Sequence, residues 1–155
     1  MFNGTLQILL TEVKKMPDII VLTGNLNYTL TLDPSSWLFD DRKFELDRYF
    51  EEPHDLDYPP RTYKKRELLQ SDFTFAIPFK PFLENGEPDP EAEALVIETK
   101  NGQQHEVPLE TAKKSILAFT KEGKFLMEDG PAHFYFGDGS NRENPVREIA
   151  KLIIR

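Results

Sequence analysis

Residues 94–112, ALVIETKNGQQHEVPLETA, contain the clearest folding pattern of the chain. Residues 94–99 are apolar over a length that suits a buried strand, and the Asn-Gly pair within residues 100–103 favours a tight hairpin turn. Residues 104–107 then form the partner strand. Pro108 predicts a short helix over 108–114, because proline is tolerated at the first position of a helix.

Outside this hairpin, apolar runs and period-two alternation predict further strands. They lie at 19–23, 26–32, 73–77, 116–120, 124–127, 133–136 and 149–154. Residues 33–36, Asp-Pro-Ser-Ser, suit a turn or a helix cap, and 78–83 suit a short helix or turn. Residues 45–51 fit either a short amphipathic helix or an extended segment with Phe44 and Leu46 inward. We therefore predict an α+β fold in which β-structure dominates and the helices are short.

The composition indicates one domain, residues 1–155, with a sizeable core. The chain has 155 residues and 12 phenylalanines. The 19 Lys plus Arg against 27 Asp plus Glu give a formal charge of −8, which opposes nucleic acid or an anionic membrane surface as a partner. No apolar stretch approaches the ~20 residues that span a bilayer, and residues 1–10 lack the basic start of a signal peptide. We expect a cytoplasmic protein.

The chain has no cysteine, which excludes a disulfide framework, a thiol nucleophile and a thiolate metal ligand. The three histidines lie in unrelated segments without metal-ligand spacing, so we also expect no metal site. Residues 52–60 contain three prolines and predict an exposed acidic loop. Residues 64–66, Lys-Lys-Arg, favour a solvated basic face, with a docking surface as the alternative.

Residues 129–142 hold the densest group of polar side chains and are the first candidate for a site. The ligand-binding candidates there are His133, Asp138, Ser140, Asn141 and Arg142. Such a loop can form an anion-binding nest of backbone amides, although Asp, Gly, Ser and Asn are also the ordinary residues of turns. His133 shares a strand face with Tyr135, which favours a partly buried, hydrogen-bonded histidine over a catalytic one.

A series of aromatic residues, Phe73, Phe75, Phe79 and Phe82, is interrupted by prolines at 78 and 81. Aromatic side chains beside prolines can line a groove for an extended peptide. Alternating phenylalanines more often pack into a core, and we favour that interpretation.

From residue 75 onward, the order of these segments resembles the oxidoreductase molybdopterin-binding domain, the central domain of the sulfite oxidase family. Residues 75–83, FAIPFKPFL, resemble that family's G-V-P-L-x-x-L-L, and 107–112, VPLETA, resemble L-P-L-E-x-A. Four further segments show weaker similarity. Residues 94–99 and the Asn-Gly pair resemble the family's next strand and its D-G turn. Residues 117–126 resemble L-A-Y-x-x-N-G-x-P-L, 129–131 resemble H-G-G-P-L-R, and 150–154 resemble K-W-L-x-x-I. Six motifs in the family's order imply its fold.

The departures from the family pattern are as informative as the matches. The family holds molybdenum through a cysteine, which this chain lacks. The family's arginine after G-G-P-L corresponds to a position near Ala132 and His133 of this chain. Leu152 stands where the family has the tryptophan of K-W. Lys151 alone matches a position that the family uses near the pterin phosphate. The resemblance therefore implies the fold and opposes the molybdenum activity.

Together these patterns predict a cofactor-free binding or interaction module with a molybdopterin-binding-like fold. Its candidate ligand-binding residues are His133, Asp138, Ser140, Asn141, Arg142 and Lys151, and its partner is a small molecule or a protein. The alternative is an enzyme on the same scaffold without molybdenum. One such activity is peptidyl-prolyl isomerisation in a groove around Phe79, Phe82 and His133.

Overall fold

The computed structural model describes residues 17–51 and 73–155, in which strands outweigh short helices, as predicted. The strands are β1 Ile20–Gly24, β2 Leu30–Leu32, β3 Phe44–Glu45, β4 Phe75–Pro78, β5 Ala94–Thr99, β6 Gln104–Pro108, β7 Ile116–Ala118, β8 Thr120–Lys121, β9 Lys124–Phe125, β10 His133–Tyr135 and β11 Ile149–Ile154. The helices are the 3₁₀ helix η1 Pro34–Phe39 and the α-helices α2 Leu46–Glu51, α4 Lys80–Gly86 and α5 Leu109–Lys113. The predictions for residues 1–10, 52–60 and 64–66 lie outside the described residues.

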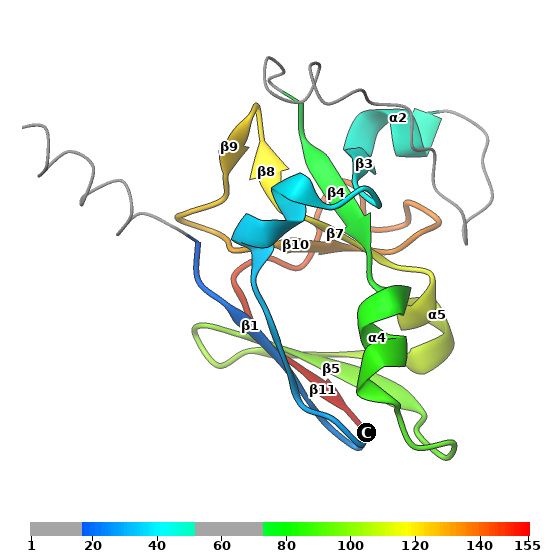
Figure 1. The fold of residues 1–155 in the computed structure, drawn as a ribbon. Helices are drawn as coiled ribbons and strands as arrows, with labels where there is room; N and C mark the ends of the chain where they lie inside the picture. Colours follow the sequence, from blue (N-terminus) through cyan, green and yellow to red (C-terminus); the bar gives the residue numbers. More distant parts are fainter. Residues whose placement is uncertain (1–16, 52–72) are drawn as a thin grey trace, which may run out of the picture.

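The first sheet has five strands in the order β2-β1-β11-β5-β6 (Figure 1). β1 and the central strand, β11, are parallel neighbours and come from opposite ends of the described chain, with Leu22 opposite Leu152. The predicted hairpin is present as β5 and β6, with Ile97 opposite His105. The first sheet therefore combines two local pairings, β1–β2 and β5–β6, with two distant ones, β1–β11 and β5–β11.

The second sheet has four antiparallel strands in the order β10-β7-β4-β3. Its register places Phe44, Ala76, Ala118 and His133 in one row across the four strands. Directly opposite residues share a face of the sheet. The row therefore has two small side chains between two large ones, and it lies on the outer face.

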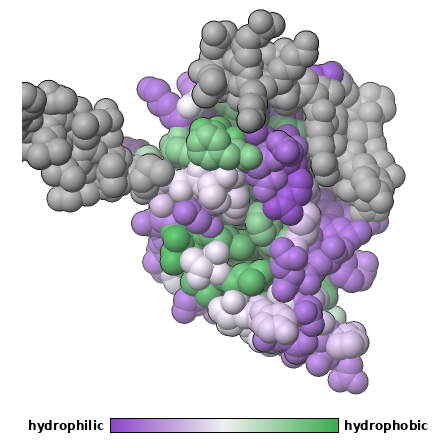
Figure 2. Space-filling view, in the orientation of Figure 1, coloured by the Kyte–Doolittle hydropathy of each residue, from purple (hydrophilic) through white to green (hydrophobic). Residues whose placement is uncertain are grey.

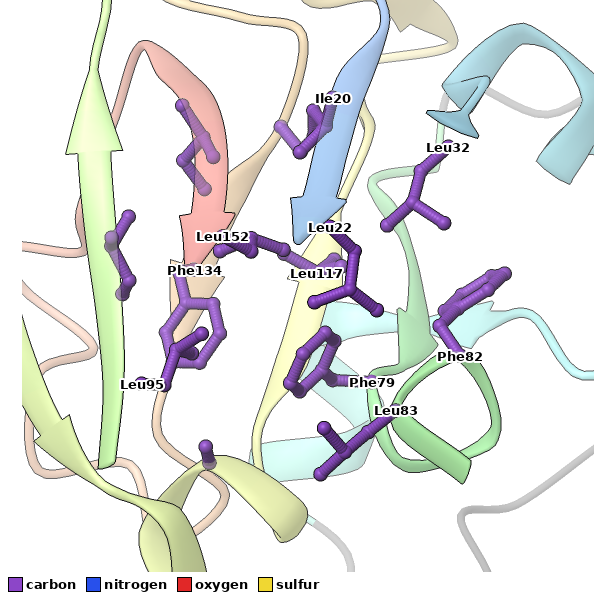
Figure 3. Packing of buried hydrophobic residues seen from close by; sticks show 14 of the residues in the cluster. Ile20, Leu22, Leu32, Phe79, Phe82, Leu83, Leu95, Leu117, Phe134 and Leu152 are labelled. Carbon is purple, nitrogen blue, oxygen red and sulfur yellow. The ribbon is translucent and has the colours of Figure 1, made fainter. Parts of the chain in front are cut away.

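The main core lies between the two sheets, where labelled side chains from both converge (Figure 3). Leu22 and Leu152 come from the first sheet, and Leu117 and Phe134 come from the second; all four are fully buried. The helices α4 and α5 contribute further apolar residues to the same cluster, including Leu83. This cluster therefore holds both sheets together, and a smaller buried cluster that includes Phe44, Tyr49 and Tyr135 covers the other face of the second sheet.

Several predicted elements differ in length or type. The strand predicted at 26–32 is reduced to β2, because the backbone N–H groups of Asn27 and Tyr28 donate to Glu87 and Gly86 instead of to a neighbouring strand. The two alternatives for 44–51 both hold in part, since β3 leads directly into α2. Pro108 precedes α5 rather than opening it.

The turn predicted at 33–36 is a helix cap. The side chain of Asp33 accepts a hydrogen bond from the backbone N–H of Ser35 at 3.1 Å and begins η1. The helices within the described part of the chain are all too short or too polar to span a bilayer.

The alternation along β11 yields a matched test of the core. Leu152 is fully buried, whereas its neighbour Lys151 is exposed on the other face. We expect Leu152→Ala to lower the free energy of unfolding by about 2 to 5 kcal/mol, because it leaves a cavity between the sheets. Lys151→Ala should change it by less than about 0.5 kcal/mol. Urea unfolding of both variants measures the difference, and equal losses would contradict this description of the core.

Candidate functional site

A cavity of about 610 Å³ lies on the outer face of the second sheet. Ala118 lies in its floor, and His133 and Tyr135 of β10 form one wall. The start of α2 contributes Asp47, and the loops on either side of β10 contribute Asp129 and Arg147. The site is thus assembled from segments that are far apart in the sequence.

The row of small residues explains why this face is hollow. Ala76 and Ala118 present only methyl groups between the larger side chains of Phe44 and His133. At the Phe44 end, Tyr49 of α2 covers the row, stacking on Phe44 with ring centroids 4.9 Å apart. The cavity lies over the other end of the row, where Ala118 and His133 line it.

His133 is buried, with 8% of its surface exposed, and its closest polar neighbour is Asp129. The His133 Nε2 atom lies 3.1 Å from Asp129 Oδ2. This is ion-pair distance, but Nε2 has no well-aligned hydrogen bond among the described residues. Burial is the largest influence and lowers the pKa of His133 below its ordinary value of 6.5, although Asp129 opposes that shift. The imidazole is therefore neutral at pH 7.

Arg142 lies at the rim of the cavity. Its Nη2 atom is 3.2 Å from Asp47 Oδ1 and 3.5 Å from Glu51 Oε1, and its guanidinium lies 5.0 Å from the ring centre of Phe50. Because Asp47 also lines the cavity, Arg142 can influence the charge there without lining it.

Asp138, Ser140 and Asn141 build the turn that follows β10. Asp138 Oδ1 accepts a hydrogen bond from the backbone N–H of Ser140 at 2.9 Å, and this bond lowers the pKa of Asp138. Asn141 accepts from the backbone N–H of Phe136 at 2.8 Å and donates to the carbonyl of Phe134 at 3.1 Å. These contacts are those of an ordinary loop, and a ligand-binding role for the three residues stays a prediction.

Lys151 lies apart from the other candidates, on the outer face of the first sheet. Its Nζ atom is 3.9 Å from Glu98 Oε2, while the next residue, Leu152, points into the core. Of the predicted site residues, His133 alone lines the cavity. Arg142 contacts its lining through Asp47, and Lys151 lies on another surface. Sequence reasoning missed Arg147 and Asp47, for which no local pattern exists. Asp129 stands four residues before His133, within the segment that the sequence singled out.

The favoured interpretation of the aromatic series, core packing, is confirmed for Phe79 and Phe82, and the alternative of a peptide groove around them and His133 is wrong. Phe79 is fully buried and Phe82 nearly so, and Phe79 meets Phe134 edge to face with ring centroids 5.9 Å apart. Successive residues of a strand point to opposite faces. Phe134 therefore faces the core with Phe79, and His133 faces the other way.

Apolar side chains are also exposed outside the cavity. Figure 2 shows hydrophobic residues near the middle of the face that is turned to the viewer, which is the face on which β1 lies in Figure 1, bordered by hydrophilic residues. Within residues 17–51 and 73–155, the large exposed apolar residues are Ile19, Tyr28, Phe39 and Met127. They come from four separate segments, and we assign no site to them.

No family model matches this chain, and no curated protein matches it in sequence. Its fold is similar to that of the sulfane dehydrogenase SoxCD from Paracoccus pantotrophus, with a TM-score of 0.54 and 15% sequence identity. The match covers 88% of this chain and 37% of the length of that chain. At this identity the likeness concerns the fold alone, and it supports the sulfite-oxidase-like domain that the sequence motifs predict.

The residues at the family's cofactor positions do not fit a molybdenum cofactor. The chain has no cysteine to supply a thiolate. Ala132 and Leu152 are fully buried in the core, and Lys151 pairs with Glu98 on a different surface. Across residues 17–51 and 73–155, no group of three His, Cys, Asp or Glu side chains could hold a metal ion.

The burial of His133 predicts a pH-dependent stability. Because the pKa is lower in the folded state than in the unfolded state, the unfolded chain binds the proton first, and stability is lost as pH falls below 6.5. Each unit of that difference is worth about 1.4 kcal/mol. We expect His133→Gln to reduce the loss of stability between about pH 7.5 and about pH 5.5, as measured by urea unfolding at both values. The exposed His105→Gln is the control, and the same pH dependence in both variants would refute this role of His133.

Asn141 should matter for the fold more than its neighbour Ser140. Asn141→Ala leaves the partly buried backbone groups of Phe134 and Phe136 without their side-chain partner. We expect a loss of about 1 to 3 kcal/mol in the free energy of unfolding. Ser140→Ala, at an exposed position, should leave it nearly unchanged. Thermal unfolding compares the two, and a silent Asn141→Ala would contradict the structural role.

Proposed function

We propose that this chain is a cofactor-free binding module with a sulfite-oxidase-like fold, and that the cavity beside β10 is its ligand site. The observation that carries the proposal is a cavity of about 610 Å³ next to a buried histidine, in a chain without any thiolate. A volume of about 300 to 1,000 Å³ is typical of small-molecule sites. The lack of cysteine also suits a reducing compartment, and we propose a cytoplasmic location.

The cavity has the mixture of surfaces that a binding site needs. Ala118, Leu126 and Tyr135 supply apolar area, and Asp129 and Arg147 supply charge at the edge. Most of the lining side chains are polar or charged, and convergent polar groups orient a ligand and select it. Because fold similarity alone does not give a function, the proposal rests on this site and not on the molybdenum chemistry of the resembling family.

An enzyme without molybdenum has less support. His133 and Asp129 form a pair that can hold a proton, but the only serine among the sequence candidates, Ser140, lies in the turn after β10. The isomerase alternative required a groove lined by Phe79 and Phe82, and both side chains belong to the core. We therefore propose binding rather than catalysis.

Metal analysis and an absorption spectrum of the purified full chain test the cofactor-free part of the proposal. We expect no stoichiometric molybdenum and no pterin absorbance, because the chain has no thiolate for the metal. Stoichiometric molybdenum or bound pterin would overturn it.

A thermal-shift screen with a library of small molecules tests the site itself. Ala118→Ile fills the floor of the cavity and should abolish the stabilisation that bound molecules give to the wild type. Ala150→Leu is the control, because Ala150 is a half-buried residue of β11 that does not line the cavity. Hits that survive Ala118→Ile would place the binding elsewhere.

A further inference from the structure

Among the residues that the structure describes, the lining of the cavity is biased toward acidic groups. These residues include four carboxylates and two basic side chains, namely Glu45, Asp47, Glu122 and Asp129 against Lys121 and Arg147. The neutral imidazole of His133 adds nothing to the positive side. A cation is therefore attracted into this space, and an anion is opposed by the same groups.

Two of the four carboxylates are available to a ligand. Asp47 is bound by Arg142, and Glu45 accepts a hydrogen bond from the backbone N–H of Arg48 at 2.7 Å. Asp129 has only the poorly aligned contact with His133 and the Nε atom of Arg147 at 3.8 Å. Glu122 has no recorded ion pair or side-chain hydrogen bond within the described ranges.

His133 independently indicates a partner that the chain does not supply. Its side chain is nine-tenths buried in the cavity wall, and Nε2 has no aligned hydrogen bond in the part of the chain that the structure describes. A buried polar atom without a hydrogen bond is uncommon and calls for an explanation. Asp129 Oδ2, which lies 3.1 Å from Nε2, belongs to a half-exposed side chain of the lining, and an ammonium group can donate to it.

The basic side chains are poorly arranged to hold an anion. Arg147 Nη1 already donates to Asn144 Oδ1 at 3.1 Å, and Arg147 Nε faces Asp129. Nη1 is therefore engaged, and an anion that approached the Nε side of the guanidinium would also meet the carboxylate of Asp129. Lys121 is exposed, and its neighbour Glu122 carries the opposite charge. The aromatic ring of Tyr135 in the wall adds a surface that favours cations.

We infer that the cavity binds a small organic cation, a molecule with a primary ammonium or guanidinium group, and that Asp129 and Glu122 recognise its charge. This inference rests on the proposed ligand-binding function and names the chemical class of the ligand.

Three probes with the same four-carbon chain and different charge test it. Putrescine is a dication, butanediol is neutral and succinate is a dianion. Each is titrated into the isotope-labelled full chain, and NMR follows the imidazole of His133 and the amides around the cavity. We expect putrescine to shift these resonances in a saturable manner, with weaker shifts from butanediol and none from succinate.

Matched variants separate recognition from general attraction to an acidic protein. Asp129→Asn and Glu122→Gln remove one charge each at the cavity and should weaken putrescine binding about tenfold. Glu110→Gln removes one charge at a helix outside it, where the carboxylate pairs with Lys113, and should leave the affinity unchanged. Because Asp129 and Glu122 are half-buried or exposed, the variants are expected to fold, and thermal unfolding verifies this.

The outcomes distinguish the two proposals. Succinate or butanediol binding as tightly as putrescine would overturn the cationic class while leaving the ligand site intact. Equal loss of affinity in Glu110→Gln and Asp129→Asn would also overturn it, because general attraction to the net negative chain would then explain the binding. If none of the three probes binds, the inference fails, and the library screen with Ala118→Ile decides the proposed function on its own.

Discussion

The parallel pairing of β1 with β11 is the contact on which the rest of the structure depends. It places Leu22 beside Leu152 and joins two segments that would otherwise be separate parts of the first sheet. Gly24 allows the pairing to continue to the end of β1. A Cβ atom at this position would lie 2.3 Å from the carbonyl oxygen of Ile154, and the φ of Gly24 is +103°, which favours glycine. Without this pairing, the inner face of the second sheet would have no continuous surface to pack against.

The core and the candidate site are two faces of the same strand. Phe134 of β10 packs into the core, while His133 and Tyr135 on either side of it face outward. Because the side-chain period of a strand is two, a slip of one residue would exchange these roles and bury the polar groups of the site. The packing of Phe134 therefore fixes where His133 lies.

The features that could be predicted from the sequence are those with a local cause. The β5–β6 hairpin follows from an apolar run and an Asn-Gly turn. The burial of His133 follows from its position on an apolar strand. The short length of β2 could not be predicted, because residues just before it, such as Asn27, pair with a segment 60 positions away. Asp47 was missed for the same reason, since it meets Arg142 across 95 positions. That Lys151 lies away from the cavity could not be predicted either, because similarity to a motif specifies a position but not the face of the sheet.

The fold of this protein and its candidate site use different surfaces. The core of this protein is built from inward-facing residues of two sheets, whereas the candidate site uses the outward-facing residues of β10 and the loops beside it. Changes in those loops cost little packing energy, because they remove few apolar contacts from the core. The inward-facing residues carry the fold that this chain shares, at 15% identity, with a sulfane dehydrogenase. In the function that we propose, the lining of the cavity and not the topology selects the charge of the ligand.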